Sequence, residues 1–76
     1  MTTINMLVEN VESDNKQVEI TLTHDKETKT YTIPVERRHL TNYFLTEMIQ
    51  KGEQYEVTMG KHGPTGIKYE GRNHPI

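Results

Sequence analysis

Alternation of apolar and polar side chains between Gln17 and Val35 constrains the fold of this chain most strongly. The apolar members are Val18, Ile20, Leu22, Tyr31, Ile33 and Val35, and threonines fill most positions between them. A period of two is typical of a strand with one buried face. The polar segment 25–28 separates the two halves, so the sequence predicts an antiparallel hairpin.

The register of this hairpin follows from matching its apolar residues. Placing Leu22 opposite Tyr31 carries Ile20 to Ile33 and Val18 to Val35. All of these side chains then share one face, which a slip of one residue would break. Pro34 cannot donate a ladder hydrogen bond, so we expect it at a sheet edge or a strand end.

Three further segments show strand patterns. A first strand is predicted around Ile4 to Glu9, with both faces partly apolar, and it ends near the polar segment 12–16. A second hairpin is predicted from the alternation in 55–59 and 67–70, joined by a long turn from Gly60 to Gly66. Residues 71–76 show no period and are expected to form an extended tail.

A helical period interrupts these strands after Pro34. The apolar residues Leu40, Phe44, Leu45, Met48 and Ile49 follow spacings of three and four, and Gly52 is a typical helix stop. The helix is predicted to begin either just past Pro34, near residues 36–40, or at Thr41 acting as N-cap, and to end at Gln50 or Lys51.

These elements predict one α+β domain over residues 1–76, in the order β-β-β-α-β-β. A small antiparallel sheet of four or five strands would pack on one amphipathic helix. A chain of 76 residues has room for a single core, and its 32% hydrophobic content is lean. Because such a small core barely stabilises the folded state, we expect a homodimer to supply additional stability.

Composition excludes several classes of protein. There is no cysteine, so disulfides are ruled out, and the four histidines lack the paired spacing of a metal site. No apolar run reaches the roughly 20 residues of a membrane span, and the first residues do not resemble a signal peptide. We therefore expect a cytoplasmic protein with no metal, no cofactor and no membrane partner.

Enzymatic activity is not expected. Ser13, the single serine, lies in an acidic loop. Thr41 and Thr46 are accounted for by the predicted helix, as a candidate N-cap and an exposed surface residue, rather than by nucleophilic catalysis. A chain this short also offers little concave volume for a pair of catalytic carboxylates. The sequence predicts no catalytic residues.

The threonines of the first hairpin are the leading candidate for binding a partner. Thr21, Thr23, Thr30 and Thr32 are predicted to lie on its outward side. Most such faces are merely solvated, but a flat, uncharged strand surface with an open edge can also pair with another protein strand.

A basic group of residues is the alternative candidate. It comprises Arg37, Arg38 and His39 near the helix start, and Lys61, His62, Lys68 and Arg72 in and just after the second hairpin. The glycine-rich segment Gly60–Gly66 could present backbone N–H groups to a phosphate, although it lacks the order of a P-loop. A net charge of -2 weighs against a dedicated nucleic-acid binder.

The function expected is that of a non-enzymatic regulatory or inhibitory protein that binds a larger protein. Short chains without cofactor chemistry are common among accessory proteins of phages and other mobile elements, so we expect this protein to belong to that group. The alternative is a small nucleic-acid-binding regulator that uses the basic group.

Overall fold

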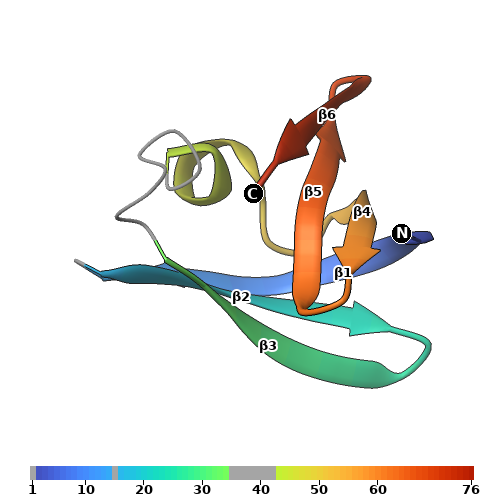
Figure 1. The fold of residues 1–76 in the computed structure, drawn as a ribbon, viewed down its shortest axis with the longest axis horizontal. Helices are drawn as coiled ribbons and strands as arrows, with labels where there is room; N and C mark the ends of the chain where they lie inside the picture. The colour runs from blue at the N-terminus through green and yellow to red at the C-terminus, as the bar shows by residue number, and fades with distance from the viewer. Residues whose placement is uncertain (1, 15, 35–42) are drawn as a thin grey trace.

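The described residues form one antiparallel sheet of six strands that bends back on itself (Figure 1). A computed structural model describes residues 2–14, 16–34 and 43–76. The strands are β1 (Thr2–Ser13), β2 (Gln17–His24), β3 (Glu27–Pro34), β4 (Gln54–Gly60), β5 (Gly63–Tyr69) and β6 (Arg72–Pro75). Their order across the sheet is β3-β2-β1-β4-β5-β6.

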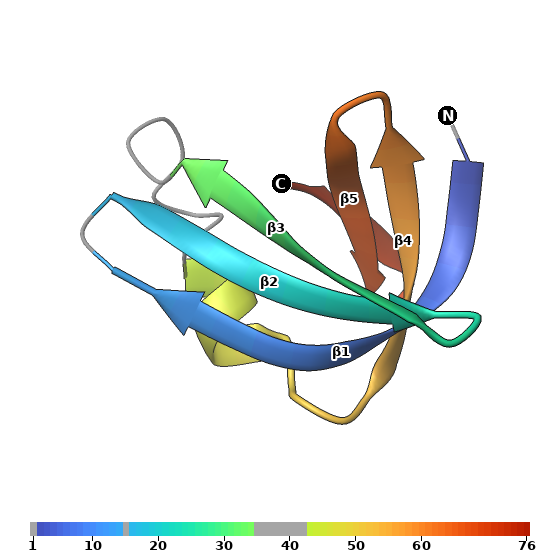
Figure 2. The same cartoon turned by 90° about the horizontal axis from the view of Figure 1, so that it is seen from below.

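The long strand β1 organises the sheet because its two halves have different partners. Residues from Thr2 to Leu7 pair with β4, and those from Leu7 to Ser13 pair with β2. The register of β1 with β2 shifts between Val8 and Asn10, which is a β-bulge, and bulges bend a strand. Figure 2 shows the resulting curve, with β2 and β3 along one half of β1 and β4 beside the other.

The core fills the inside of this bend. Its fully buried side chains come from four strands and from the segment between β3 and β4, and they are Val8, Val18, Ile20, Leu22, Leu45, Val57 and Ile67. The sheet also approaches itself where the turn between β4 and β5 packs on Tyr31 of β3. A Cβ at Gly63 would lie 3.0 Å from the Tyr31 ring, so the close contact depends on glycine.

The predicted α+β class is wrong, because the sheet covers its own inner face. Within the described residues, helical structure is limited to Tyr43 and the π-helical turn η1 (Phe44–Met48). The expected start of the helix lies outside the described residues. Its expected end at Gln50 or Lys51 is wrong, since Ile49 is already extended with ψ 129°.

The physical reason for this short turn lies in its residues and their contacts. Aromatic and β-branched residues such as Tyr43, Phe44 and Thr46 favour helix weakly, and short helices are marginal without packing. Phe44 and Leu45 are buried in the core. The chain then leaves in an extended direction, where the Gln50 N–H donates to the Tyr55 hydroxyl at 3.0 Å. The helical spacing thus identified buried residues but not a long helix.

The register predicted for the first hairpin is wrong by two residues. Its turn consists of Asp25 and Lys26 alone, both left-handed with φ 51° and 67°. β2 therefore ends at His24 and β3 begins at Glu27, in place of a loop that extends to residue 28. The observed pairs are Ile20 with Tyr31, Val18 with Ile33 and Leu22 with Lys29. Because the shift is even, the predicted inner and outer faces are preserved.

The C-terminal half of the sheet also has tighter connections than expected. Gly60 pairs with Gly63, so Lys61 and His62 form a two-residue turn in place of the long turn predicted over 60–66. The segment predicted as an extended tail contains β6, which pairs with β5. The ring of His74 stacks on Phe44 with centroids 4.4 Å apart, and this contact joins β6 to η1.

Candidate functional site

The outer face of β2 and β3 carries an ordered array of threonines, named here the threonine face: Thr21, Thr23, Thr28, Thr30 and Thr32. The β2–β3 register sets Thr21 opposite Thr30 and Thr23 opposite Thr28, while Thr32 lies opposite Glu19. All four threonines predicted from the sequence belong to this face. Thr28 is the member that the sequence does not predict, because it falls in the polar segment 25–28 that is expected to form the loop.

Hydrogen bonds join the threonines across the two strands. The Thr21 and Thr30 hydroxyls lie 3.0 Å apart, and those of Thr23 and Thr28 lie 2.9 Å apart. One hydroxyl of each pair donates to the other, which leaves one O–H and several lone pairs for a further partner. β-Branched side chains also have restricted χ1 rotamers, so little conformational entropy is lost when another surface binds.

The immediate border of the threonine face mixes charge with apolar surface. Thr23 lies opposite Leu7 of β1, which is half-buried, and Thr21 lies opposite Asn10. Glu12 pairs with Glu19 at the far end of β1 and β2. An acidic end and an uncharged centre would therefore meet any partner that covers this face.

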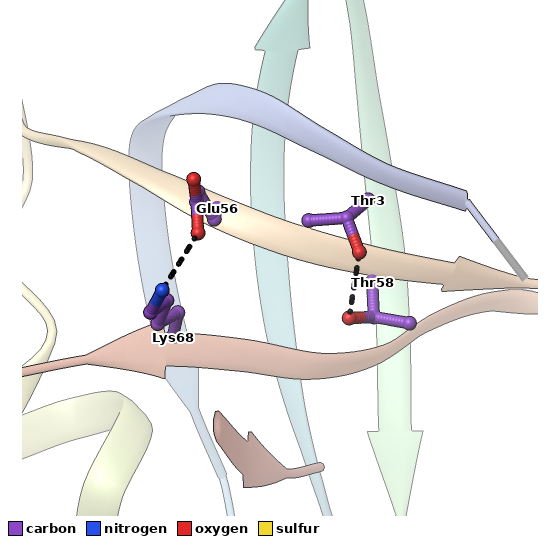
Figure 3. A network of polar contacts seen from close by, with 4 residues as sticks. All are labelled: Thr3, Glu56, Thr58 and Lys68. Atoms are coloured by element: carbon purple, nitrogen blue, oxygen red, sulfur yellow. Dashed lines mark hydrogen bonds and ion pairs between the residues drawn. The ribbon is translucent and has the colours of Figure 1, made fainter. Parts of the chain in front are cut away.

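The remainder of the outer face, over β1, β4 and β5, contains a second polar group (Figure 3). The Lys68 Nζ lies 3.5 Å from a carboxylate oxygen of Glu56, and both side chains are about half exposed. The hydroxyls of Thr3 and Thr58 lie 3.4 Å apart. These four residues, with Gly71 and Asn73, line a shallow hollow of about 290 Å³. Since Glu56 offsets the charge of Lys68, the hollow does not favour an anion.

The basic group predicted from the sequence is only partly described. Arg37, Arg38 and His39 lie outside the described residues. Lys61 and His62 occupy the turn before β5, whereas Arg72 follows β5 at its other end. Seven strand residues separate these ends by roughly 20 Å. The described members are therefore spread along β5 rather than gathered around one phosphate.

The Gly60–Gly66 segment does not form an open loop. Met59 pairs with Pro64 and Thr58 pairs with Gly66, with an irregularity between them, so most of the segment belongs to β4 and β5. Gly66 is buried beside the Asn73 side chain. A Cβ added to Gly66 would lie only 2.9 Å from the Asn73 Oδ1. Strand pairing and close packing account for these glycines, which removes the geometric basis for a phosphate cradle.

Searches against protein-family models, curated proteins and solved structures found no match to this chain. The class defined by the described residues is that of a small, predominantly β domain with one bent sheet. No helix in the described ranges is long and apolar enough to cross a bilayer.

Proposed function

We propose that this protein is a non-enzymatic regulatory or inhibitory protein that binds a larger protein through the threonine face. The observation that carries the proposal is the pair of hydroxyl bridges, Thr21–Thr30 and Thr23–Thr28, on an uncharged surface. Such a surface costs less to desolvate than a charged one, and its remaining hydroxyl groups can form specific hydrogen bonds.

Substitutions on β2 test this proposal most directly. Thr21→Arg and Thr23→Arg each place a long cation in the centre of the threonine face, without altering the backbone hydrogen bonds of the sheet. We expect tagged wild-type protein to retain one stoichiometric protein partner from its native cell extract. Each arginine variant should reduce the retained amount at least about 10-fold, as loss of a central interface contact does.

Lys61→Glu provides the matched control, because it also changes charge on an exposed residue but lies in the turn between β4 and β5. This variant should retain the same partner as the wild type. Circular dichroism of all variants would verify that the sheet is intact. Equal capture by wild type and both arginine variants would overturn the threonine face as the binding surface, and a blank capture would overturn the function.

The nucleic-acid alternative predicts a different result in a salt titration. Phosphate contacts release counterions, so binding to mixed DNA and RNA would weaken steeply as salt rises. Lys61→Glu and Arg72→Glu should then lower the affinity, while Thr21→Arg should not. We expect no binding at low salt, because the described basic residues are dispersed and Lys68 is paired with Glu56.

A further inference from the structure

We infer that the open edge of β3 pairs with β3 of a second copy of this chain, antiparallel, with Thr30 on the two-fold axis. β3 is an outermost strand of the sheet, and β2 is its one neighbour among the described strands (Figure 1). Eight residues make β3 twice as long as β6, the strand at the opposite margin. This inference concerns self-association and does not depend on the larger partner proposed above.

The hairpin geometry identifies which backbone groups of β3 face outward. A two-residue turn with both residues left-handed is flanked by a hydrogen-bonded pair, which here is His24 with Glu27. Alternate residues along β3 then bond to β2, and Thr28, Thr30 and Thr32 direct their N–H and C=O groups to the open side. The Gln17 carbonyl supports this assignment of inward and outward residues. It accepts from the Asp14 N–H and so faces away from β3.

Pro34 occupies the next outward position, opposite Gln17. Its missing N–H therefore costs β3 no bond to β2, as expected for a proline at a sheet edge. It also limits the outward donors to Thr28, Thr30 and Thr32. The open edge thus offers three consecutive threonines with both backbone groups available.

One antiparallel register satisfies all three threonines. With Thr30 opposite Thr30 of the second copy, Thr28 lies opposite Thr32, and six backbone hydrogen bonds can form. A shift of two residues one way sets Lys29 opposite Lys29, which brings like charges together. The opposite shift sets Pro34 opposite Thr28, so the Thr28 C=O of each copy finds no N–H donor.

The side chains on both faces of β3 favour the same register. Lys29 and Tyr31 belong to the inner face of β3, and Lys29 of one copy would lie opposite Tyr31 of the other, where an ammonium can contact the aromatic ring. On the outer face, Thr28 of one copy extends the row of Thr32 and Glu19 in the other. The two threonine faces would join into one continuous surface.

Disulfide trapping tests the register, because the chain has no cysteine of its own. Residues in a hydrogen-bonded pair have Cα atoms about 5.5 Å apart, within the range that a disulfide spans. Thr30→Cys should therefore give a covalent dimer under mild oxidation. Thr28→Cys and Thr32→Cys alone should each give no covalent dimer, since like residues would be about 13 Å apart, but a mixture of the two should crosslink.

Thr30→Pro tests the backbone hydrogen bonds without disturbing the β2–β3 ladder, because the Thr30 N–H faces outward. We expect the dimer dissociation constant, measured by analytical ultracentrifugation, to rise about 10- to 100-fold. Thr30→Val keeps the N–H and should remain dimeric, as should Thr21→Arg, which changes the threonine face but not the edge.

A wild-type protein that sediments at its monomer mass of 8.9 kDa up to sub-millimolar concentration would overturn the inference. So would crosslinking of Thr28→Cys or Thr32→Cys alone at the rate of Thr30→Cys. A monomeric wild-type protein could still capture a larger protein through the threonine face. Failure of the dimer and failure of the proposed function are therefore distinguishable.

Discussion

At the residue scale, a few backbone-directed contacts fix the turns that set the strand register. The Asp14 carboxylate accepts from the backbone N–H of Lys16 at 2.7 Å and of Gln17 at 2.9 Å. These two hydrogen bonds, the former being the larger effect, hold the pKa of Asp14 below its usual value of 3.8. The turn between β1 and β2 is therefore stabilised by the charged form of one side chain.

The pH dependence of stability should reflect this hydrogen bonding. Because the pKa of Asp14 is lower in the folded state, its stabilising contribution is present above pH 3.8 and is lost as the pH falls through the folded value. Asp14→Asn should abolish that part of the loss. Thermal unfolding between neutral pH and about pH 2 would measure it, with Glu9→Gln as the control for removing one charge; identical pH profiles for wild type and Asp14→Asn would contradict the prediction.

Gly63 offers a second test at this scale. Its φ is +128°, and an added Cβ would approach the Tyr31 ring to 3.0 Å, so both backbone strain and crowding oppose a side chain. We expect Gly63→Ala to lower the free energy of unfolding by about 1–3 kcal/mol. Gly71→Ala is the control, since Gly71 has φ +80° but no atom within 4 Å of a Cβ. Chemical denaturation should show a larger loss for Gly63→Ala; an equal loss would mean that Tyr31 moves aside without cost.

At the scale of elements, η1 contributes to the fold through its buried side chains rather than through helix length. Its backbone closes with the Ile49 N–H donating to the Phe44 carbonyl at 3.1 Å. Leu45 is fully buried, whereas Tyr43 is 61% exposed. The turn thus fixes a short segment against the inner face of the sheet, and β6 packs on it through the stacked rings of Phe44 and His74.

Substitutions in and beside η1 should separate these roles. Leu45→Ala leaves a cavity in the core and should lower the free energy of unfolding by about 2–5 kcal/mol. Tyr43 lies two residues before Leu45 but is exposed. Tyr43→Ala should therefore change the free energy of unfolding by less than about 0.5 kcal/mol. Urea denaturation measures both values. A small effect of Leu45→Ala would show that the sheet closes its core without η1.

At the scale of the whole molecule, strand order determines which regions open first. Among the described strands, β1 has hydrogen-bonded neighbours on both sides, whereas β3 and β6 have one neighbour each. Opening of β6 breaks its pairing with β5 and the contact of His74 with Phe44, but opening of β1 separates both halves of the sheet. Local stability should therefore fall from the centre of the sheet to its margins.

Native-state hydrogen exchange should reveal this gradient. We expect the bonded amides of β1 at Met6 and Val8 to exchange slowest, since the Val8 N–H donates to the Glu53 carbonyl at 3.0 Å, and those of β6 to exchange fastest. On β3, the inward amides of Lys29 and Tyr31 should be more protected than the outward ones in a monomeric Thr30→Pro variant. Uniform protection across the sheet would contradict the gradient and indicate a single cooperative opening.

The sequence by itself determined the strands other than β6, their inner and outer faces, and most of the threonine face. Local alternation carries that information, since Val18, Ile20 and Leu22 must leave water together wherever the chain folds. It could not supply the register, because the left-handed conformation of Asp25 and Lys26 follows from strand pairing as much as from their identities. Nor could it separate a helix from a short buried turn around Phe44, as both bury residues at spacings of three and four.

Only the tertiary structure decided the architecture. The bend of β1 at the bulge beside Glu9 lets one sheet enclose its own core, so the helix that the sequence predicted is not needed to cover it. The same bend places Gly63 against Tyr31, two residues far apart in the sequence. Such contacts depend on how strands pair over long separations, and the free energy of those pairings is shared among many residues rather than encoded in one local pattern.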